Sequence, residues 1–181
     1  MSRSEKTDPA PSLQWMWANI FRKGDADQVA IRESIEKIPL FQDLTKKELR
    51  RVEESLYLRK YRADSFIFRA GEPGLGMYII HAGSVWIERP EEGDSDDSVG
   101  SEPFLELGPG DFFGEMALFE QNVHLVSARA HTHAALLGFF RPDLMTLSHQ
   151  YPRLGCKLLL ALGRVISDRF RASLTGGPLR A

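Results

Sequence analysis

The stretch Gly110-Asp-Phe-Phe-Gly-Glu-Met-Ala-Leu118 decides the fold of this chain, because short β runs precede it and another strand run follows it. Gly114 permits a tight backbone turn, and the residues from Glu115 to Leu118 favour helix. The free N–H groups of such a first turn favour a phosphate or a carboxylate. Glu115 accepts from hydroxyl groups, which suggests a ligand with both groups, such as a ribose phosphate. A purely structural Gly-Glu turn stays open at this point.

Short strands are expected on both sides of this stretch. Glycine-containing segments at residues 71–74, 82–83 and 108–110 separate the apolar runs and mark turns. Short strands with regularly spaced glycine turns predict a small sandwich or barrel. The expected strand runs begin at Tyr57 and include Phe66–Phe68, Met77–Ile80, Val85–Ile87, Phe104–Leu107 and one longer run, Ser127–Phe139.

Helices are expected at both ends of the strand region. Thr45 and Glu48 have the spacing of a capping box at a helix start. The last helix carries an apolar stripe from Leu158 to Phe170 that is wide enough for two surfaces, the domain itself and a second copy of the chain. The expected helices cover residues 13–21, 27–37, 45–56, 142–150 and 152–173.

The leading helix, residues 13–21, presents Trp15 and Trp17. Two tryptophans on a short helix need a surface to bury against. The domain itself or a dimer mate is expected, and a separate partner or a membrane surface is the alternative. Residues 1–10 are expected to be disordered because they are polar and lack periodicity.

Composition indicates an ordinary soluble protein. With 181 residues and 43% hydrophobic content, the chain can bury one core. A net charge of −2 gives no case for nucleic acid or an anionic membrane. Membrane spans and a signal peptide are not expected, so we expect a cytoplasmic protein. The single Cys156 is expected to be buried. The acidic connection from Pro90 to Glu102 is expected to be a solvated hairpin tip rather than a calcium loop.

Two closely spaced histidines raise the alternative of an enzyme. His131 and His133 on a strand point the same way, like the metal pair of cupin barrels. Such sites need a nearby carboxylate and a third histidine, but no Glu occurs between Ala134 and Gln150. We therefore expect no catalytic residues, no metal site and no cofactor.

Two segments together resemble the cyclic-nucleotide-binding domain family, which includes catabolite-activator-type regulators, protein kinase regulatory subunits and gated channels. Residues 71–83 resemble the family's turn and paired strand, and residues 107–118 resemble the start of its phosphate-binding cassette. The resemblance covers residues 38–171. It implies a mainly β fold with flanking helices, an eight-stranded jelly-roll barrel with the ligand inside. The expected division is an extension at 1–37, the domain at 38–173 and a tail at 174–181.

The resemblance also implies a binding site. The backbone around Gly114, Met116 and Ala117 would face the cyclic phosphate, and Glu115 would accept from the ribose 2′-hydroxyl. The second half of the cassette departs from the family pattern, because His124 stands in place of the arginine and only Ser127 fits. The predicted ligand-binding residues are Phe113, Gly114, Glu115, Met116, Ala117, His124, Leu125 and Ser127.

The missing arginine is expected to weaken binding of the anionic ligand. A charge-assisted hydrogen bond contributes about 1.5–3 kcal/mol, so its loss weakens binding by roughly ten- to a few hundred-fold. Protonated His124 would recover part of this, more so in acid. Arg129, two residues beyond Ser127, is a second candidate cation. A strand that simply packs Leu125 and Val126 is the structural alternative.

The sequence thus predicts a non-enzymatic regulatory module that senses a small anion of the cyclic AMP or cyclic GMP class and signals to a partner protein, through a homodimer formed by the last or first helix. The alternative is a pseudo-sensor, a docking scaffold that has lost its ligand. Only about ten residues follow Arg171, too few for a helix-turn-helix, so direct DNA binding is not expected.

Overall fold

The computed structural model describes residues 25–90 and 103–176, with side chains from residue 31 onward. The predictions of a disordered start, a leading helix at 13–21, an acidic hairpin tip from residue 91 and the last part of the tail lie outside these residues.

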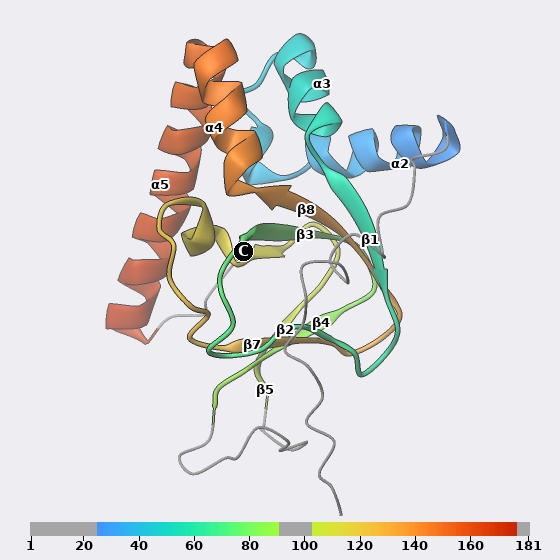
Figure 1. Ribbon diagram of the computed structural model, residues 1–181, viewed down its shortest axis with the longest axis vertical. Coiled ribbons are helices and arrows are strands. Elements are labelled where there is room, and N and C mark those ends of the chain that lie inside the picture. The colour runs from blue at the N-terminus through green and yellow to red at the C-terminus, as the bar shows by residue number, and fades with distance from the viewer. Residues whose placement is uncertain (1–24, 91–102, 177–181) are drawn as a thin grey trace, which may run out of the picture.

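The described strands form two four-stranded antiparallel sheets that face each other as a jelly-roll barrel (Figure 1). One sheet has the order β1-β8-β3-β6 and the other β2-β7-β4-β5. This architecture confirms the expected fold. The strands are β1 (Tyr57–Tyr61), β2 (Phe66–Phe68), β3 (Gly76–Ala82), β4 (Val85–Glu88), β5 (Pro103–Leu107), β6 (Phe112–Phe113), β7 (Ser127–Ala130) and β8 (Ala134–Phe140).

The prediction of one strand run from Ser127 to Phe139 is wrong. This segment forms two strands, β7 and β8, which belong to different sheets. β7 lies between β2 and β4, whereas β8 lies between β1 and β3. A bend at residues 131–133 carries the chain from one sheet to the other. It contains no glycine or proline, so the local signal for a turn was missing.

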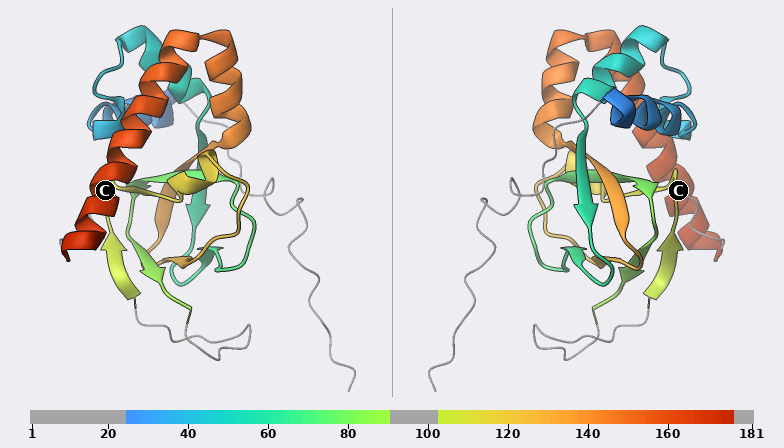
Figure 2. Two further views of the ribbon diagram at one scale, coloured as in Figure 1. Left: turned by 90° about the vertical axis from the view of Figure 1, so that its left-hand side faces the viewer. Right: turned by 90° about the vertical axis from the view of Figure 1, so that its right-hand side faces the viewer.

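Helices cover one end and one side of the barrel. α2 (Asp25–Glu36), η1 (Pro39–Phe41), α3 (Lys46–Glu54) and α4 (Arg141–Gln150) gather at one end, and α5 (Pro152–Thr175) runs along the side (Figures 1 and 2). The capping box is confirmed, since the Thr45 hydroxyl accepts from the Glu48 N–H and the Glu48 carboxylate accepts from the Thr45 N–H. Across residues 25–90 and 103–176, none of the helices has the length and hydropathy to cross a bilayer.

Two apolar clusters hold these layers together. One fills the barrel, and the other lies between the helices and the outer face of the β1-β8-β3-β6 sheet. The buried residues of α5 are Leu154, Gly155, Leu158 and Leu162, so only its first half is anchored by a fully buried face. The prediction that Cys156 is buried is wrong, because this thiol is exposed on the opposite side of the helix from the buried stripe.

Candidate ligand-binding site

A cavity of about 540 Å³ lies beside the turn that contains Gly114. The short helix η2 (Glu115–Leu118) lies on one side of it, and strands β4, β5 and β6 together with α5 supply further walls. Its lining is mainly apolar, with Glu115, Glu120 and Arg169 as the charged residues. The full lining is Phe68, Gly74, Ile87, Phe104, Leu105, Leu107, Phe112, Phe113, Gly114, Glu115, Met116, Ala117, Glu120, Asn122, Val123, His124, Leu125, Val126 and Arg169.

The turn owes its shape to Gly114. Its φ of 77° lies in the left-handed region, which residues with a Cβ rarely adopt. An added Cβ would also lie 3.0 Å from the carbonyl oxygen of Gly76. The Ala117 N–H donates back to the Gly114 carbonyl at 3.2 Å, which leaves the N–H groups of Glu115 and Met116 without partners inside the short helix. The residues of this turn line the cavity, so the two N–H groups are candidate donors to a ligand.

A second loop packs tightly against η2. A Cβ on Gly74 would lie 2.9 Å from the Ala117 Cβ and 3.0 Å from the Asn122 carbonyl. The Gly74 N–H donates to that same Asn122 carbonyl at 2.9 Å. Only glycine fits this approach, so the segment after β2 and the segment after η2 are held side by side around the cavity.

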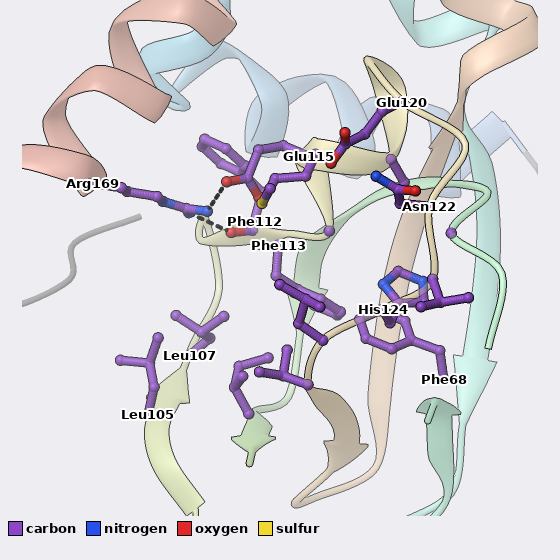
Figure 3. Close-up of a pocket in the computed structure, with 18 of the residues that line it drawn as sticks. Phe68, Leu105, Leu107, Phe112, Phe113, Glu115, Glu120, Asn122, His124 and Arg169 are labelled. Atoms are coloured by element: carbon purple, nitrogen blue, oxygen red, sulfur yellow. Dashed lines mark hydrogen bonds and ion pairs between the residues drawn. The ribbon is translucent and has the colours of Figure 1, made fainter. Parts of the chain in front are cut away.

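Glu115 links the cavity to α5. Its carboxylate is buried and accepts from Arg169 Nη1 at 2.5 Å, and Arg169 Nη2 donates to the Phe112 carbonyl at 2.8 Å (Figure 3). The predicted hydroxyl acceptor is thus already engaged by a cation. Any ligand hydroxyl that binds Glu115 must share it with Arg169 or displace it.

His124 closes another part of the wall. Its ring stacks on Phe68, with centroids 3.6 Å apart and planes 6° apart (Figure 3). Burial lowers the pKa of His124 below its usual value of 6.5, so most of the imidazole is neutral at pH 7. At neutral pH this wall offers an aromatic face rather than a fixed positive charge.

The structure brings most of the predicted residues together and leaves their role in binding as a prediction. All line the cavity except Ser127, whose hydroxyl accepts from the Ala70 N–H at 3.0 Å. Leu125 is 73% exposed and lies at the rim, so it does not plug the cavity. Arg129 lies outside the lining and pairs with buried Glu88 at 2.5 Å, which corrects its candidacy as the missing cation.

The structure places the histidine pair differently from the expectation. His131 and His133 lie in the bend between β7 and β8 rather than on a strand, which corrects the expectation. The His131 ring stacks on Trp86 with centroids 3.8 Å apart. Across the described ranges, no group of three or more metal-ligating side chains was found.

Sequence reasoning missed Arg169 and Phe68 as cavity residues. Arg169 is 54 residues from Glu115, and a charged residue near the end of a helix resembles an ordinary solvated position. The one available signal was Glu115 itself, since a carboxylate on a folded turn needs a partner when it is buried.

Comparison with known proteins agrees with this geometry. The family model "Cyclic nucleotide-binding domain" matches residues 58–151, just over half of the 181 residues. The chain therefore belongs to the cyclic nucleotide-binding domain family.

Relatives include a cyclic nucleotide-gated channel and a cyclic AMP receptor protein. The chain is 31% identical over 145 residues to a cyclic nucleotide-gated potassium channel of Mesorhizobium japonicum, covering 77% of this chain and 38% of the channel. It is 30% identical over 130 residues to the cyclic AMP receptor protein of Thermus thermophilus, covering 72% of this chain and 58% of that protein. The chain thus spans less than two thirds of the length of either relative.

Solved structures show the same fold. A cyclic nucleotide-binding domain from Methylobacillus flagellatus superposes with a TM-score of 0.72 at 25% identity, covering 89% of both chains. The Thermus thermophilus catabolite activator protein gives a TM-score of 0.66 at 28% identity, covering 76% of this chain and 61% of that one.

Proposed function

We propose that this chain is a non-enzymatic, cytoplasmic regulatory module that senses a small anionic ligand of the cyclic AMP or cyclic GMP class. The observation that carries the proposal is the cavity beside the Gly114 turn, open to solvent and next to backbone donors. Relatives named for cyclic nucleotide gating and for cyclic AMP reception support the ligand class. The sensing unit is the expected domain at residues 38–173.

Each part of the ligand has a matching part of the cavity. The phosphate lies against the Gly114–Ala117 backbone and near His124, and a ribose hydroxyl donates to Glu115. The base lies against the apolar wall that includes Leu105, Leu107 and Val126. A neutral His124 leaves the phosphate with backbone donors alone at pH 7, so we expect affinity in the micromolar range or weaker.

Sensing requires that the bound ligand change something outside the cavity, and the Glu115–Arg169 pair provides the connection. The fully buried contacts of α5 lie in its first half, from Leu154 to Leu162. Further along the helix, Arg169 ties α5 to Glu115 and to the Phe112 carbonyl. A ribose hydroxyl that donates to Glu115 weakens the Glu115–Arg169 ion pair, and the second half of α5 then packs less firmly against the barrel.

The outer face of α5 is the surface that passes the signal on. It exposes large apolar side chains at Leu160 (65%), Phe170 (63%) and Leu174 (71%). Such a face favours contact with a second copy or an effector protein, in line with the expected homodimer. No direct contact with DNA is part of the proposal.

Titration calorimetry with cyclic AMP and cyclic GMP tests the proposal. Saturable binding at micromolar ligand, with one ligand per chain, supports sensing. Silence at millimolar concentrations of both nucleotides supports the second candidate, a ligand-free docking scaffold. That candidate rests on His124 in place of the arginine and on the exposed apolar face of α5.

A further inference from the structure

Arg59 on β1 is a buried cation without a described counter-ion. The residue is 4% exposed, and its Nε has no hydrogen-bond partner in the part of the chain that the structure describes. Every salt bridge found among the described residues involves other cations. A buried charge in this position is costly unless something compensates it.

Three uncharged aromatic side chains interact with Arg59. Its guanidinium interacts with the hydroxyl of Tyr61 and lies 5.1 Å from the centroid of the Phe140 ring. It also acts electrostatically on Tyr78. Burial raises the pKa of both tyrosine hydroxyls, so they stay neutral at physiological pH. These contacts solvate the cation without cancelling its charge.

One carboxylate lies in the same region but does not pair with Arg59. Glu72 acts electrostatically on Tyr78, and its Oε2 accepts from the Arg69 N–H at 2.9 Å. It is half-buried, so solvent and the backbone donor share its charge. The net positive field of Arg59 is reduced by this group and not abolished.

Aromatic rings connect Arg59 to the cavity wall, since its guanidinium lies over Phe140 and the Phe140 ring lies 6.1 Å from the Tyr78 ring. The Tyr78 ring lies 6.1 Å from Phe68 and 5.7 Å from Phe113, and both phenylalanines line the cavity. Aromatic side chains screen a charge far less than water does, so the field passes through them. By contrast, Arg129 is neutralised by Glu88.

The charged residues that line the cavity do not by themselves attract an anion, so a positive potential must come from outside the lining. Its own charged lining consists of two carboxylates, Glu115 and Glu120, and one guanidinium, Arg169, which is already paired. With His124 neutral, this lining disfavours an anion.

We propose that Arg59 supplies the positive potential that draws an anion into the cavity, replacing through the aromatic wall the arginine that the phosphate-binding segment lacks. This inference rests on the proposed function and names a positioning residue, since Arg59 acts without touching the ligand. It predicts that the cavity selects for ligand charge through a residue outside its own lining.

Arg59→Met tests this role, with cyclic AMP and its uncharged phosphate methyl ester as probes at pH 7.5. Two unit charges on the order of 10 Å apart at an effective dielectric constant of about 20 change an affinity by roughly tenfold. We therefore expect cyclic AMP to bind about tenfold more weakly to the variant and the ester to bind equally to both proteins. The melting temperature should hold or rise, because an unpaired buried charge is gone.

Arg62→Met is the matched control. Arg62 lies three positions further along the chain and is exposed, so water screens its charge. Its removal should change neither affinity. Should Arg59→Met fail to fold, Arg59→Gln removes the same charge and keeps a donor for Tyr61.

The outcomes are distinguishable. A wild-type chain that binds neither probe at millimolar concentration overturns the proposed function, and the role of Arg59 with it. Wild-type binding of cyclic AMP that the Arg59 variant matches overturns the role of Arg59 alone. Equal weakening of cyclic AMP and its ester also overturns it, because Arg59 would then shape the cavity instead of charging it.

Discussion

Replacing Arg169 by methionine removes the tie between α5 and the cavity. The variant leaves the Glu115 carboxylate, whose side chain is 8% exposed, without its cation. Breaking one side of a fully buried pair costs about 3–5 kcal/mol. Because the Arg169 side chain is itself 21% exposed, we expect a loss of about 2–3 kcal/mol in the free energy of unfolding. For a chain of this size, that corresponds to a fall of roughly 4–12 °C in melting temperature.

Arg164→Met is the matched control on the same helix. Arg164 pairs with Asp43 at 3.2 Å, but the two side chains are 71% and 74% exposed. Exposed pairs contribute about 0–1 kcal/mol, so this variant should melt within a few degrees of the wild type. A drop in the Arg169 variant no larger than in this control would refute the assigned contribution of the pair.

Amide hydrogen exchange measures the effect of Arg169→Met on α5. The second half of the helix lacks fully buried residues, so its amides should exchange faster in Arg169→Met than in the wild type. Cyclic AMP should produce a similar acceleration in the wild type and little further change in the variant. Unchanged exchange in the free variant would mean that Arg169 does not hold α5.

Three further perturbations separate the other parts of the site and fold. Acidification should lower the stability of the free protein and tighten ligand binding, both through His124. The pKa of His124 in the folded protein lies below 6.5, so the unfolded chain takes up the proton first. The free energy of unfolding therefore falls as the pH drops below about 6.5. Urea unfolding at pH 5.5 and 7.5 should show this slope reduced in His124→Gln, and calorimetry should show cyclic AMP binding more tightly to the wild type at pH 5.5. Gly114→Ala should cost about 1–2 kcal/mol, because alanine is strained at a φ of 77°, and should weaken binding; an unchanged melting curve would contradict the geometry. Lys157→Met should reduce the stabilisation from Glu48, whose pKa of about 2 owes most to Lys157; that stabilisation is present above pH 4.5 and lost as the pH falls toward about 2, so an unaltered acid-unfolding profile would count against it.

The sequence allowed prediction where the determining residues are near each other in the chain. Thr45 and Glu48 form their capping box within one helical turn. Gly114 and the helix formers after it specify the η2 turn in the same local way. The strands β2, β3, β4 and β5 all overlap the expected runs, because glycine turns separate them.

Prediction failed where sheets and helices far apart in the sequence decide the outcome. Cys156 belongs to an apolar segment, but the side of α5 that meets the domain is set by Leu154, Leu158 and Leu162. Arg169 meets Glu115 only because α5 runs back past the barrel. Arg59 is buried because it shares the inward parity of Tyr61 on β1, and a charged residue gives no sequence signal for burial.

The most direct measurement is a crystal structure of the chain soaked with cyclic AMP. The account predicts ligand density against the Gly114–Ala117 backbone, a ribose hydroxyl on Glu115, and Arg169 moved away from that carboxylate. An empty cavity at saturating ligand, or a bound nucleotide with the Glu115–Arg169 pair intact, would contradict it.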